Sequence, residues 1–207
     1  MSEDGQAGEA RLTAKGKATR GRIVDAAAEL MFAHGVARTG VEDVQKRAGV
    51  SASQLYHYFG DKRTLVRAVI ARQTEAVLEA QEPLIGRLDS FEGLQAWRDV
   101  LVDLQRQRAC AGGCPLGTLA AELADADPEA RAELAAGFDR WEEPIRAGLR
   151  AMHERGDLRP EADPDRLALA VLAAVQGGLL LTQTRRDPEP LAVALDTVLA
   201  HIHTFAA

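Results

Sequence analysis

The sequence predicts an all-α protein of about nine helices, with a small three-helix unit at the N-terminus and a larger helical part after it. Apolar residues recur at helical spacing along most of the chain, and no stretch alternates apolar and polar residues as a strand does. Glycine, proline and aspartate signals such as AGGCP, DADP and RRDPEP separate the periodic segments. With 207 residues, 46% of them hydrophobic, the chain is long enough for a substantial core.

The N-terminal unit is predicted at residues 19–65, with a helix-turn-helix at about 41–60. Residues 1–18 before it are polar, glycine-rich and without apolar period, so we expect a disordered tail. A first helix then places its apolar residues on one face and stops at Gly35. Two short helices joined by a glycine turn follow it, at 41–48 and at about 51–59.

Residues 66–207 form the larger part of the predicted fold. A long helix starts near Asp61 and ends before Pro83, so it runs from the first part into the second. No internal repeat is present. Further helices are predicted at about 90–109, 115–125, 128–154, 163–184 and 188–205.

Charge is distributed unevenly along the chain. The net charge of -6 argues at first sight against a nucleic-acid partner. Residues 1–70, however, hold eleven Lys and Arg against eight Asp and Glu, whereas the remainder holds fourteen against twenty-three. All four lysines lie in the first part. The first part is therefore the one suited to a polyanion, and the rest is acidic.

The sequence favours a cytoplasmic protein that does not enter membranes. Its first residues lack the apolar centre of a secretory signal. The apolar run Leu167 to Leu181 is interrupted and too short to span a bilayer, so we expect a helix buried on nearly every side. Cys110 and Cys114 have no histidine beside them, which favours reduced structural cysteines over a redox or metal role. No metal or cofactor is predicted.

Residues 49–65, GVSASQLYHYFGDKRTL, have the composition of a helix that enters a DNA groove. The major groove of B-DNA admits one α-helix, which contacts base edges through short polar side chains near its N-terminus. Gln54 lies on the first turn and can pair bidentately with adenine, and His57 follows one turn later. Leu55 and Phe59, four residues apart, can anchor the opposite face in the core.

Groups that suit phosphate oxygens flank these side chains. Tyr56 and Tyr58 carry hydroxyls, and Lys62 adds charge at the positive N-terminus of the next helix. Each residue also has an ordinary explanation, because aromatic clusters are usually core and a single His57 or Lys62 is more often only solvated. The ordered combination of glycine turn, polar first turn, aromatic cluster and lysine favours DNA binding.

This combination resembles the DNA-binding half of TetR-family transcriptional regulators over about residues 18–78. The matching elements are Gly35, Ala48-Gly49-Val50-Ser51, Leu55-Tyr56-His57-Tyr58-Phe59 and Lys62. The resemblance implies base contacts from Ser53, Gln54 and His57. It implies phosphate contacts from Thr39, Ser51, Tyr56, Tyr58 and Lys62.

Two residues depart from the family pattern. Gly40 stands where the family usually has a Thr or Ser that caps the second helix, so a phosphate contact there must come from Thr39 or the backbone. Gln45 replaces the usual alanine inside the second helix. Either its side chain reaches the surface, or the second and third helices sit slightly apart.

The last two predicted helices suit a homodimer interface. A single short recognition helix contacts too few base pairs to specify a genomic site, and a symmetric dimer doubles the site. Two helices from each subunit can form a four-helix interface, although the same apolar residues can instead form intramolecular core. The predicted interface residues are Val171, Leu172, Val175, Leu179, Leu195, Val198, Leu199 and Ile202.

The middle helices are expected to enclose a pocket for a small apolar effector. For any one residue, core packing is the stronger interpretation. The string GGCPLGTLAAELAD followed by DPE resembles a TetR branch that includes drug- and flavonoid-responsive repressors. The predicted pocket residues are Trp97, Leu101, Cys114, Leu116, Phe138, Trp141 and Gln176.

The resulting expectation is a homodimeric repressor that a small apolar ligand releases from a palindromic operator in double-stranded DNA. The alternative is a DNA-binding regulator that has no effector or acts as an activator. An enzyme is not expected, because the sequence has no phosphate-binding glycine loop, no metal-spaced His and Cys set and no nucleophile elbow.

Overall fold

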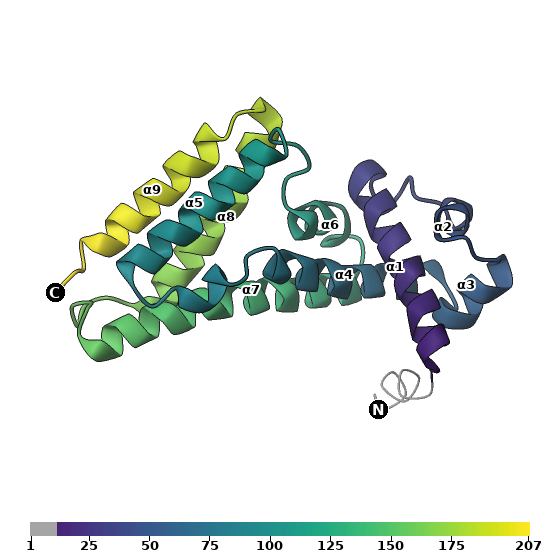
Figure 1. The fold of residues 1–207 in the computed structure, drawn as a ribbon, viewed down its shortest axis with the longest axis horizontal. Coiled ribbons are helices and arrows are strands. Elements are labelled where there is room, and N and C mark those ends of the chain that lie inside the picture. Colours follow the sequence, from purple (N-terminus) through teal and green to yellow (C-terminus); the bar gives the residue numbers. More distant parts are fainter. Residues whose placement is uncertain (1–11) are drawn as a thin grey trace. The chain divides into compact units, whose positions relative to one another are not determined.

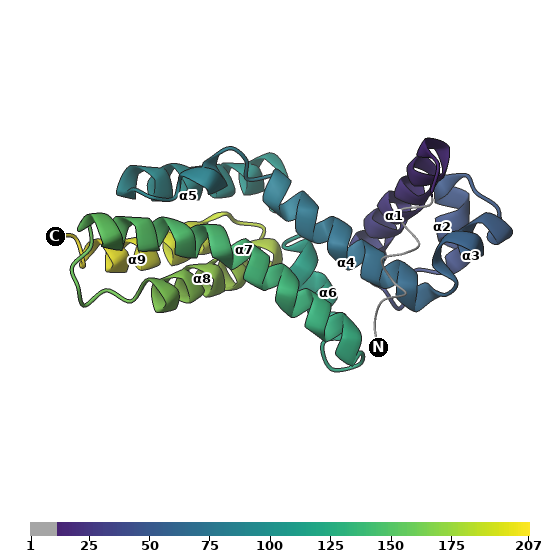
Figure 2. The same cartoon turned by 90° about the horizontal axis from the view of Figure 1, so that it is seen from below.

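The computed structural model describes residues 12–207, and this part of the chain is helical, as the sequence predicts. Nine α-helices and one short 3-10 helix lie between Ala14 and His203. No strand is present in this range, only an isolated antiparallel bridge between Leu158 and Ala206. Figures 1 and 2 show the ribbon in two views. The chain forms two compact units, and the second begins at Gln73.

The first unit contains three helices and the start of a fourth. Its core is formed by the apolar face of α1, including Ile23 and Met31, together with Leu55 and Leu65, all at most 1% exposed. The turn between α2 and α3 is made by Gly49, whose φ of 63° is a left-handed conformation that favours glycine. The helices are α1 (Ala14–His34), α2 (Val41–Ala48), α3 (Ala52–Phe59) and α4 (Lys62–Glu79).

Helix α1 begins earlier than the sequence predicts. The Thr13 side chain accepts a hydrogen bond from the Gly16 N–H at 3.2 Å and so caps a helix that starts at Ala14. Residues 14–18, expected in a disordered tail, are therefore helical: the threonine cap satisfies the first turn, and no proline interrupts it, so the cost of Gly16 is tolerated. Residues 1–11 of the predicted tail lie outside the described residues.

The two units are divided inside α4, between Arg72 and Gln73. The sequence placed this boundary at residues 65–66. It lies later because the first half of α4 buries Leu65 and Val69, both at 0% exposure, in the first unit. One helix therefore belongs to both units.

The second unit contains a larger set of helices. Helix α8 packs against both α7 and α9, while α5 packs against α9 and α6 against α7. In Figure 1 the teal α5 and the yellow α9 run beside each other. The elements are η2 (Leu84–Arg87), α5 (Phe91–Gln107), α6 (Pro115–Leu123), α7 (Pro128–Arg155), α8 (Pro164–Arg185) and α9 (Glu189–His203).

The sequence predicts that α8 is buried on nearly every side, but the structure shows otherwise. Leu169 and Leu180 are 59% and 63% exposed. Within residues 12–207, α8 is also the one helix whose length and composition would allow it to cross a membrane, contrary to the expectation that it is too short. Core helices of soluble proteins pass the same test, and 44% of the apolar window of α8 is buried in this unit.

A glycine of α7 permits a close backbone contact. A Cβ at Gly148 would lie 2.3 Å from the carbonyl oxygen of Leu88, in the segment after η2. No real Cβ contact is that short, so any side chain at this position forces the backbone apart. By contrast, a Cβ at Gly21 in α1 meets nothing within 4 Å.

We therefore expect Gly148→Ala to lower the free energy of unfolding by about 1–3 kcal/mol, the usual range for overpacking a core. Gly21→Ala is the matched control and should raise it by up to about 1 kcal/mol, because alanine is the better helix former. Chemical denaturation of both variants measures the difference. Equal effects would show that the α7 contact with Leu88 is looser than described.

Candidate nucleic-acid interface

Helix α3 buries one face and exposes the other. Leu55 and Phe59 are 0% and 2% exposed and anchor the helix, as the four-residue spacing predicts. The predicted base contacts Ser53, Gln54 and His57 all lie on the exposed side. The three side chains are therefore placed where an external ligand can reach them.

The first turn of α3 is closed by a capping box. The Gln54 N–H donates to Ser51 Oγ at 3.2 Å, and the Ser51 N–H donates to Gln54 Oε1 at 3.0 Å. The Ser51 hydroxyl also lies 3.0 Å from the Ser53 hydroxyl. Gln54 therefore uses its carbonyl oxygen to start the helix, and a bidentate pair with adenine requires this box to open. Its amide nitrogen can donate to a base without that change.

Thr39 does not present its hydroxyl to solvent. The residue is 2% exposed, and its Oγ1 donates to the Gly35 carbonyl at 2.8 Å. The predicted phosphate contact from this side chain is therefore wrong for the described conformation. The other option, the backbone at Gly40, is also engaged, because the Gly40 N–H donates to the Asp43 carboxylate at 3.1 Å.

The remaining predicted phosphate contacts are accessible to different degrees. Tyr56 is 51% exposed, whereas Tyr58 is half-buried and meets His57 edge to face at a centroid distance of 5.1 Å. Ser51 is exposed. The Lys62 ammonium donates to the Val36 carbonyl at 2.8 Å, so it fixes the turn after α1 and keeps two further N–H donors.

Other exposed basic side chains of the first unit were counted in the charge balance but given no role. Lys15 and Lys17 lie on the first turns of α1, Arg38 precedes α2 and Lys46 lies in its last turn. Arg47 differs, because it is paired with Glu29 at 2.5 Å. The other four side chains are exposed, and the structure shows no ion pair for them within residues 12–207.

The start of α4 is fixed by Asp61, directly after α3. Its carboxylate accepts a hydrogen bond from the Thr64 N–H at 2.8 Å. Hydrogen bonding to Thr64 lowers the pKa of Asp61 below its ordinary value. Asp61 therefore stays ionised as an N-cap, and the chain leaves α3 with a defined direction into α4.

The predicted pocket residues of the second unit differ in their hydrogen bonds and in their burial. Trp97 and Trp141 both donate their indole N–H to Gln81 Oε1, at 2.9 and 3.1 Å. Cys114 is the N-cap of α6, and Gln176 of α8 is half-buried, with its side-chain nitrogen buried and without a hydrogen-bond partner among the described residues. Leu101 and Leu116 are buried, and Phe138 is half-buried.

Both cysteines are free and buried. Cys114 caps α6, because its sulfur accepts a hydrogen bond from the Gly117 N–H at 3.4 Å. Burial raises the pKa of the Cys114 thiol above its ordinary value, so the thiol is protonated at neutral pH. Among residues 12–207, no group of three or more His, Cys, Asp and Glu is placed to hold a metal ion.

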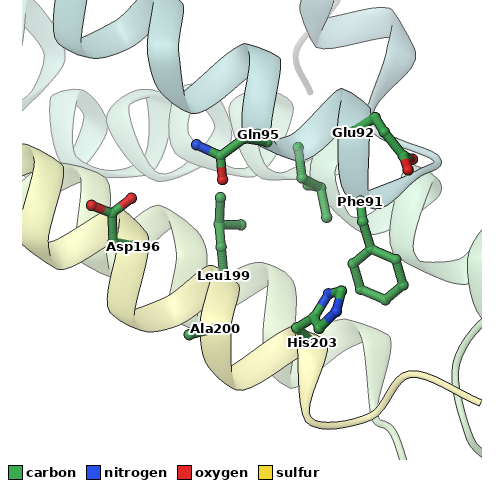
Figure 3. A pocket seen from close by; sticks show the side chains of 8 residues that line it. Phe91, Glu92, Gln95, Asp196, Leu199, Ala200 and His203 are labelled. Carbon is green, nitrogen blue, oxygen red and sulfur yellow. The ribbon is translucent and has the colours of Figure 1, made fainter.

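A hollow of about 430 Å³ lies between α5 and α9 (Figure 3). None of the seven predicted residues lines it. Phe91 and His203 meet edge to face there at a centroid distance of 4.4 Å. At the edge of the hollow, the Asp196 carboxylate accepts hydrogen bonds from Nε and Nη2 of Arg98, each at 2.7 Å. This hollow was not found from the sequence, because α5 and α9 are far apart along the chain.

The predicted dimer residues lie mainly inside the protomer. Seven of the eight are at most 9% exposed, and Val198 is half-buried, so these side chains pack α8 and α9 within one chain. The prediction chose the wrong face because α8 is apolar all round, and spacing alone does not say which face turns inward. The buried residues are Val171, Leu172, Val175, Leu179, Leu195, Leu199 and Ile202.

Comparison with known proteins agrees with this architecture. Residues 23–69 match the family model described as bacterial regulatory proteins, tetR family. Residues 90–198 match the model described as tetracyclin repressor-like, C-terminal domain. Together the two matches cover most of the chain. The chain belongs to the TetR family.

Relatives named as transcriptional regulators are similar to this chain over most of its sequence. The chain is 31% identical over 181 residues to an uncharacterised HTH-type transcriptional regulator of Mycobacterium tuberculosis, covering 83% of this chain and 88% of that protein. It is 26% identical to the HTH-type transcriptional repressor DhaR of Mycobacterium sp. (strain GP1), covering 86% and 89%. A solved TetR regulator from Chloroflexus aurantiacus is 29% identical, with a TM-score of 0.79 over 94% of this chain and 98% of that chain.

Proposed function

We propose that this TetR-family DNA-binding transcriptional regulator is a cytoplasmic homodimeric repressor that binds a palindromic operator and leaves it when a small apolar ligand binds. The observation that carries the DNA-binding step is the exposed polar face of α3, held by the buried Leu55 and Phe59. The relative DhaR is named a repressor, which supports the direction of regulation.

In this proposal the residues of α3 and its flanks divide by role. Ser53, His57 and the Gln54 amide nitrogen contact base edges, because short polar side chains at a recognition helix N-terminus reach the groove floor. Tyr56 and the two remaining donors of Lys62 contact phosphate. The exposed Lys15, Lys17, Arg38 and Lys46 add charge that attracts any DNA sequence.

Gln54→Ala should reduce discrimination between the selected operator and a scrambled duplex by about 1–3 kcal/mol, since it removes a base contact. Lys62→Met should weaken binding to both duplexes alike and reduce the slope of log K against log salt by about 1, since it removes a phosphate contact. Fluorescence anisotropy with labelled duplexes over a range of salt concentrations measures both quantities.

Ser51→Ala is the control for these DNA measurements. It opens the same capping box as Gln54→Ala but leaves the Gln54 amide in place. Its cost should appear in protein stability, at about 1 kcal/mol, and not in the ratio of the two duplex affinities. A Gln54→Ala ratio equal to that of Ser51→Ala would show that Gln54 acts only as a helix cap.

The homodimer is proposed through the outward face of α8 instead of the residues first predicted. Leu169, Ala173, Gly177 and Leu180 recur at spacings of four, four and three residues and are all exposed. A Cβ at Gly177 meets nothing within 4 Å in the protomer. An exposed apolar stripe with small residues at its centre suits a second copy of the same helix, packed around a two-fold axis.

Gly177→Arg should convert the dimer to a monomer, because the protomer has room for the side chain and the proposed interface does not. Operator affinity should fall with it, since one recognition helix contacts half of a palindrome. Ala132→Arg, at an exposed position of α7, is the matched control and should remain dimeric. Sedimentation analysis of both variants gives the oligomeric state, and a dimeric Gly177→Arg variant would refute this interface.

The effector step has a competing hypothesis, a DNA-binding regulator without a ligand. The packing of Trp97 and Trp141 on Gln81 favours that alternative, since it uses two predicted pocket residues as core. For a ligand-responsive repressor, apolar compounds that raise the melting temperature should lower operator affinity, typically about 5–150-fold. If such compounds bind the protein without lowering its operator affinity, the hypothesis of a regulator without an effector is favoured, and the DNA-binding proposal stays intact.

A further inference from the structure

The hollow between α5 and α9 is lined by one face of each helix. The four residues from α9 recur at spacings of three, one and three, which places them on a single helical stripe. At 1.5 Å per residue, this stripe is about 10 Å long. The volume of about 430 Å³ falls in the range of small-molecule sites. The lining residues are Phe91, Glu92, Leu94 and Gln95 of α5, and Asp196, Leu199, Ala200 and His203 of α9.

The two ends of the hollow differ in chemistry. Phe91 and His203 meet edge to face at one end, at a centroid distance of 4.4 Å, and Asp196 lies at the other end (Figure 3). Leu199 and Ala200 lie between these ends on α9. The hollow therefore offers an aromatic end, an apolar middle and an acidic end to a ligand that lies along α9.

The acidic end has more carboxylates than cations. Arg98 donates to both oxygens of Asp196, at 2.7 Å each, and its remaining terminal nitrogen pairs with Asp99 at 3.0 Å. One guanidinium thus serves two carboxylates. Glu92 adds a further carboxylate to the lining, and none of the described residues that line the hollow is Lys or Arg. The surroundings of the hollow therefore keep an excess of negative charge, which favours a cation.

Gln95 presents an acceptor to the same space. Its amide nitrogen donates to the Asp99 carboxylate at 3.3 Å, which leaves the amide oxygen for another donor. In Figure 3 this oxygen points toward Leu199, across the hollow. An ammonium group has three donors and no acceptor, so it matches a carbonyl and a carboxylate better than a hydroxyl or a carboxyl group does.

We propose that the hollow between α5 and α9 binds a small organic cation, an alkylammonium with an apolar or aromatic body about 10 Å long. The ammonium lies at Asp196 and the Gln95 carbonyl, and the body extends over Leu199 to Phe91 and His203. The site is separate from the effector pocket expected among the middle helices, since none of those predicted residues lines it. It requires no DNA, so it does not depend on the proposed function.

The probe is 4-phenylbutylamine, whose ammonium and ring match the two ends of the hollow. Its amine is protonated at neutral pH, as a lysine side chain is. Isothermal titration calorimetry of the full-length protein should give a dissociation constant of about 1 mM or below. The neutral analogue 4-phenylbutan-1-ol should bind about fivefold more weakly, the upper range for one exposed charge pair. The anionic analogue 4-phenylbutyrate should be weaker still, because its charge is repelled.

Two variants place the binding in the hollow. Asp196→Asn removes one charge and should weaken amine binding about fivefold, to the affinity of the alcohol. Its matched control is Asp165→Asn, because Asp165 forms an equivalent two-nitrogen pair with Arg150 elsewhere in the unit. Ala200→Phe, at an exposed position, fills the hollow and should abolish binding. Ala132→Phe on α7 is its control, and both controls should bind the amine as the wild type does.

Four results would overturn the proposal. They are no amine binding at 10 mM, amine affinity no higher than that of the alcohol, unchanged amine binding in Asp196→Asn, and unchanged amine binding in Ala200→Phe. Sedimentation analysis of Ala200→Phe tests the other occupant, a second copy of the chain. A changed oligomeric state would show that the hollow belongs to an interface between copies, which also overturns the cation site. None of these outcomes bears on DNA binding.

Discussion

The second unit depends on the burial of one face of α8 against α7 and α9. Val171, Val175, Leu195 and Ile202 are all 0% exposed there, and full burial of such side chains contributes about 1.5–3 kcal/mol each. The close approach at Gly178, where a Cβ would lie 2.9 Å from the Leu191 backbone, makes this packing possible. Because α8 is apolar all round, burial of one face within the protomer leaves apolar surface exposed to water on the other. Burial of that surface is the physical reason to expect a second subunit.

In the first unit, the short helix α3 needs support from its surroundings. It has eight residues, and an isolated helix of that length is only marginally stable in water. Two anchors and a capping box hold it, and the anchors leave most of its surface to solvent. Rigidity therefore comes from the buried side, and the exposed side is left for recognition. The capping role of Gln54 shows that the two tasks are not fully separated, because one side chain serves the helix start and faces outward.

The spacing of apolar residues predicted the helices and the burial of Leu55 and Phe59, because short amphipathic helices have a single apolar face. The resemblance to TetR regulators indicated Ser53, Gln54 and His57, which lie on the exposed side. Spacing could not orient α8, which has no polar face to mark the outside. It also could not foresee Thr39, whose hydroxyl finds a local backbone acceptor at Gly35. The two hydrogen bonds that Gln81 Oε1 accepts come from indoles 16 and 60 residues away in sequence, long-range contacts that no local pattern encodes.

Charge placement explains how an acidic chain keeps a surface for DNA. In the second unit several arginines are committed to carboxylates: Arg98 binds Asp196 through two nitrogens, and Arg150 binds Asp165 in the same way. Such pairs suit the planar guanidinium fork and cancel charge locally. The lysines lie only in the first unit, where Lys15, Lys17 and Lys46 are exposed. An ammonium on a flexible stem stays hydrated and mobile, so it can follow phosphates without a fixed partner. The excess acid of the second unit disfavours DNA there by charge repulsion.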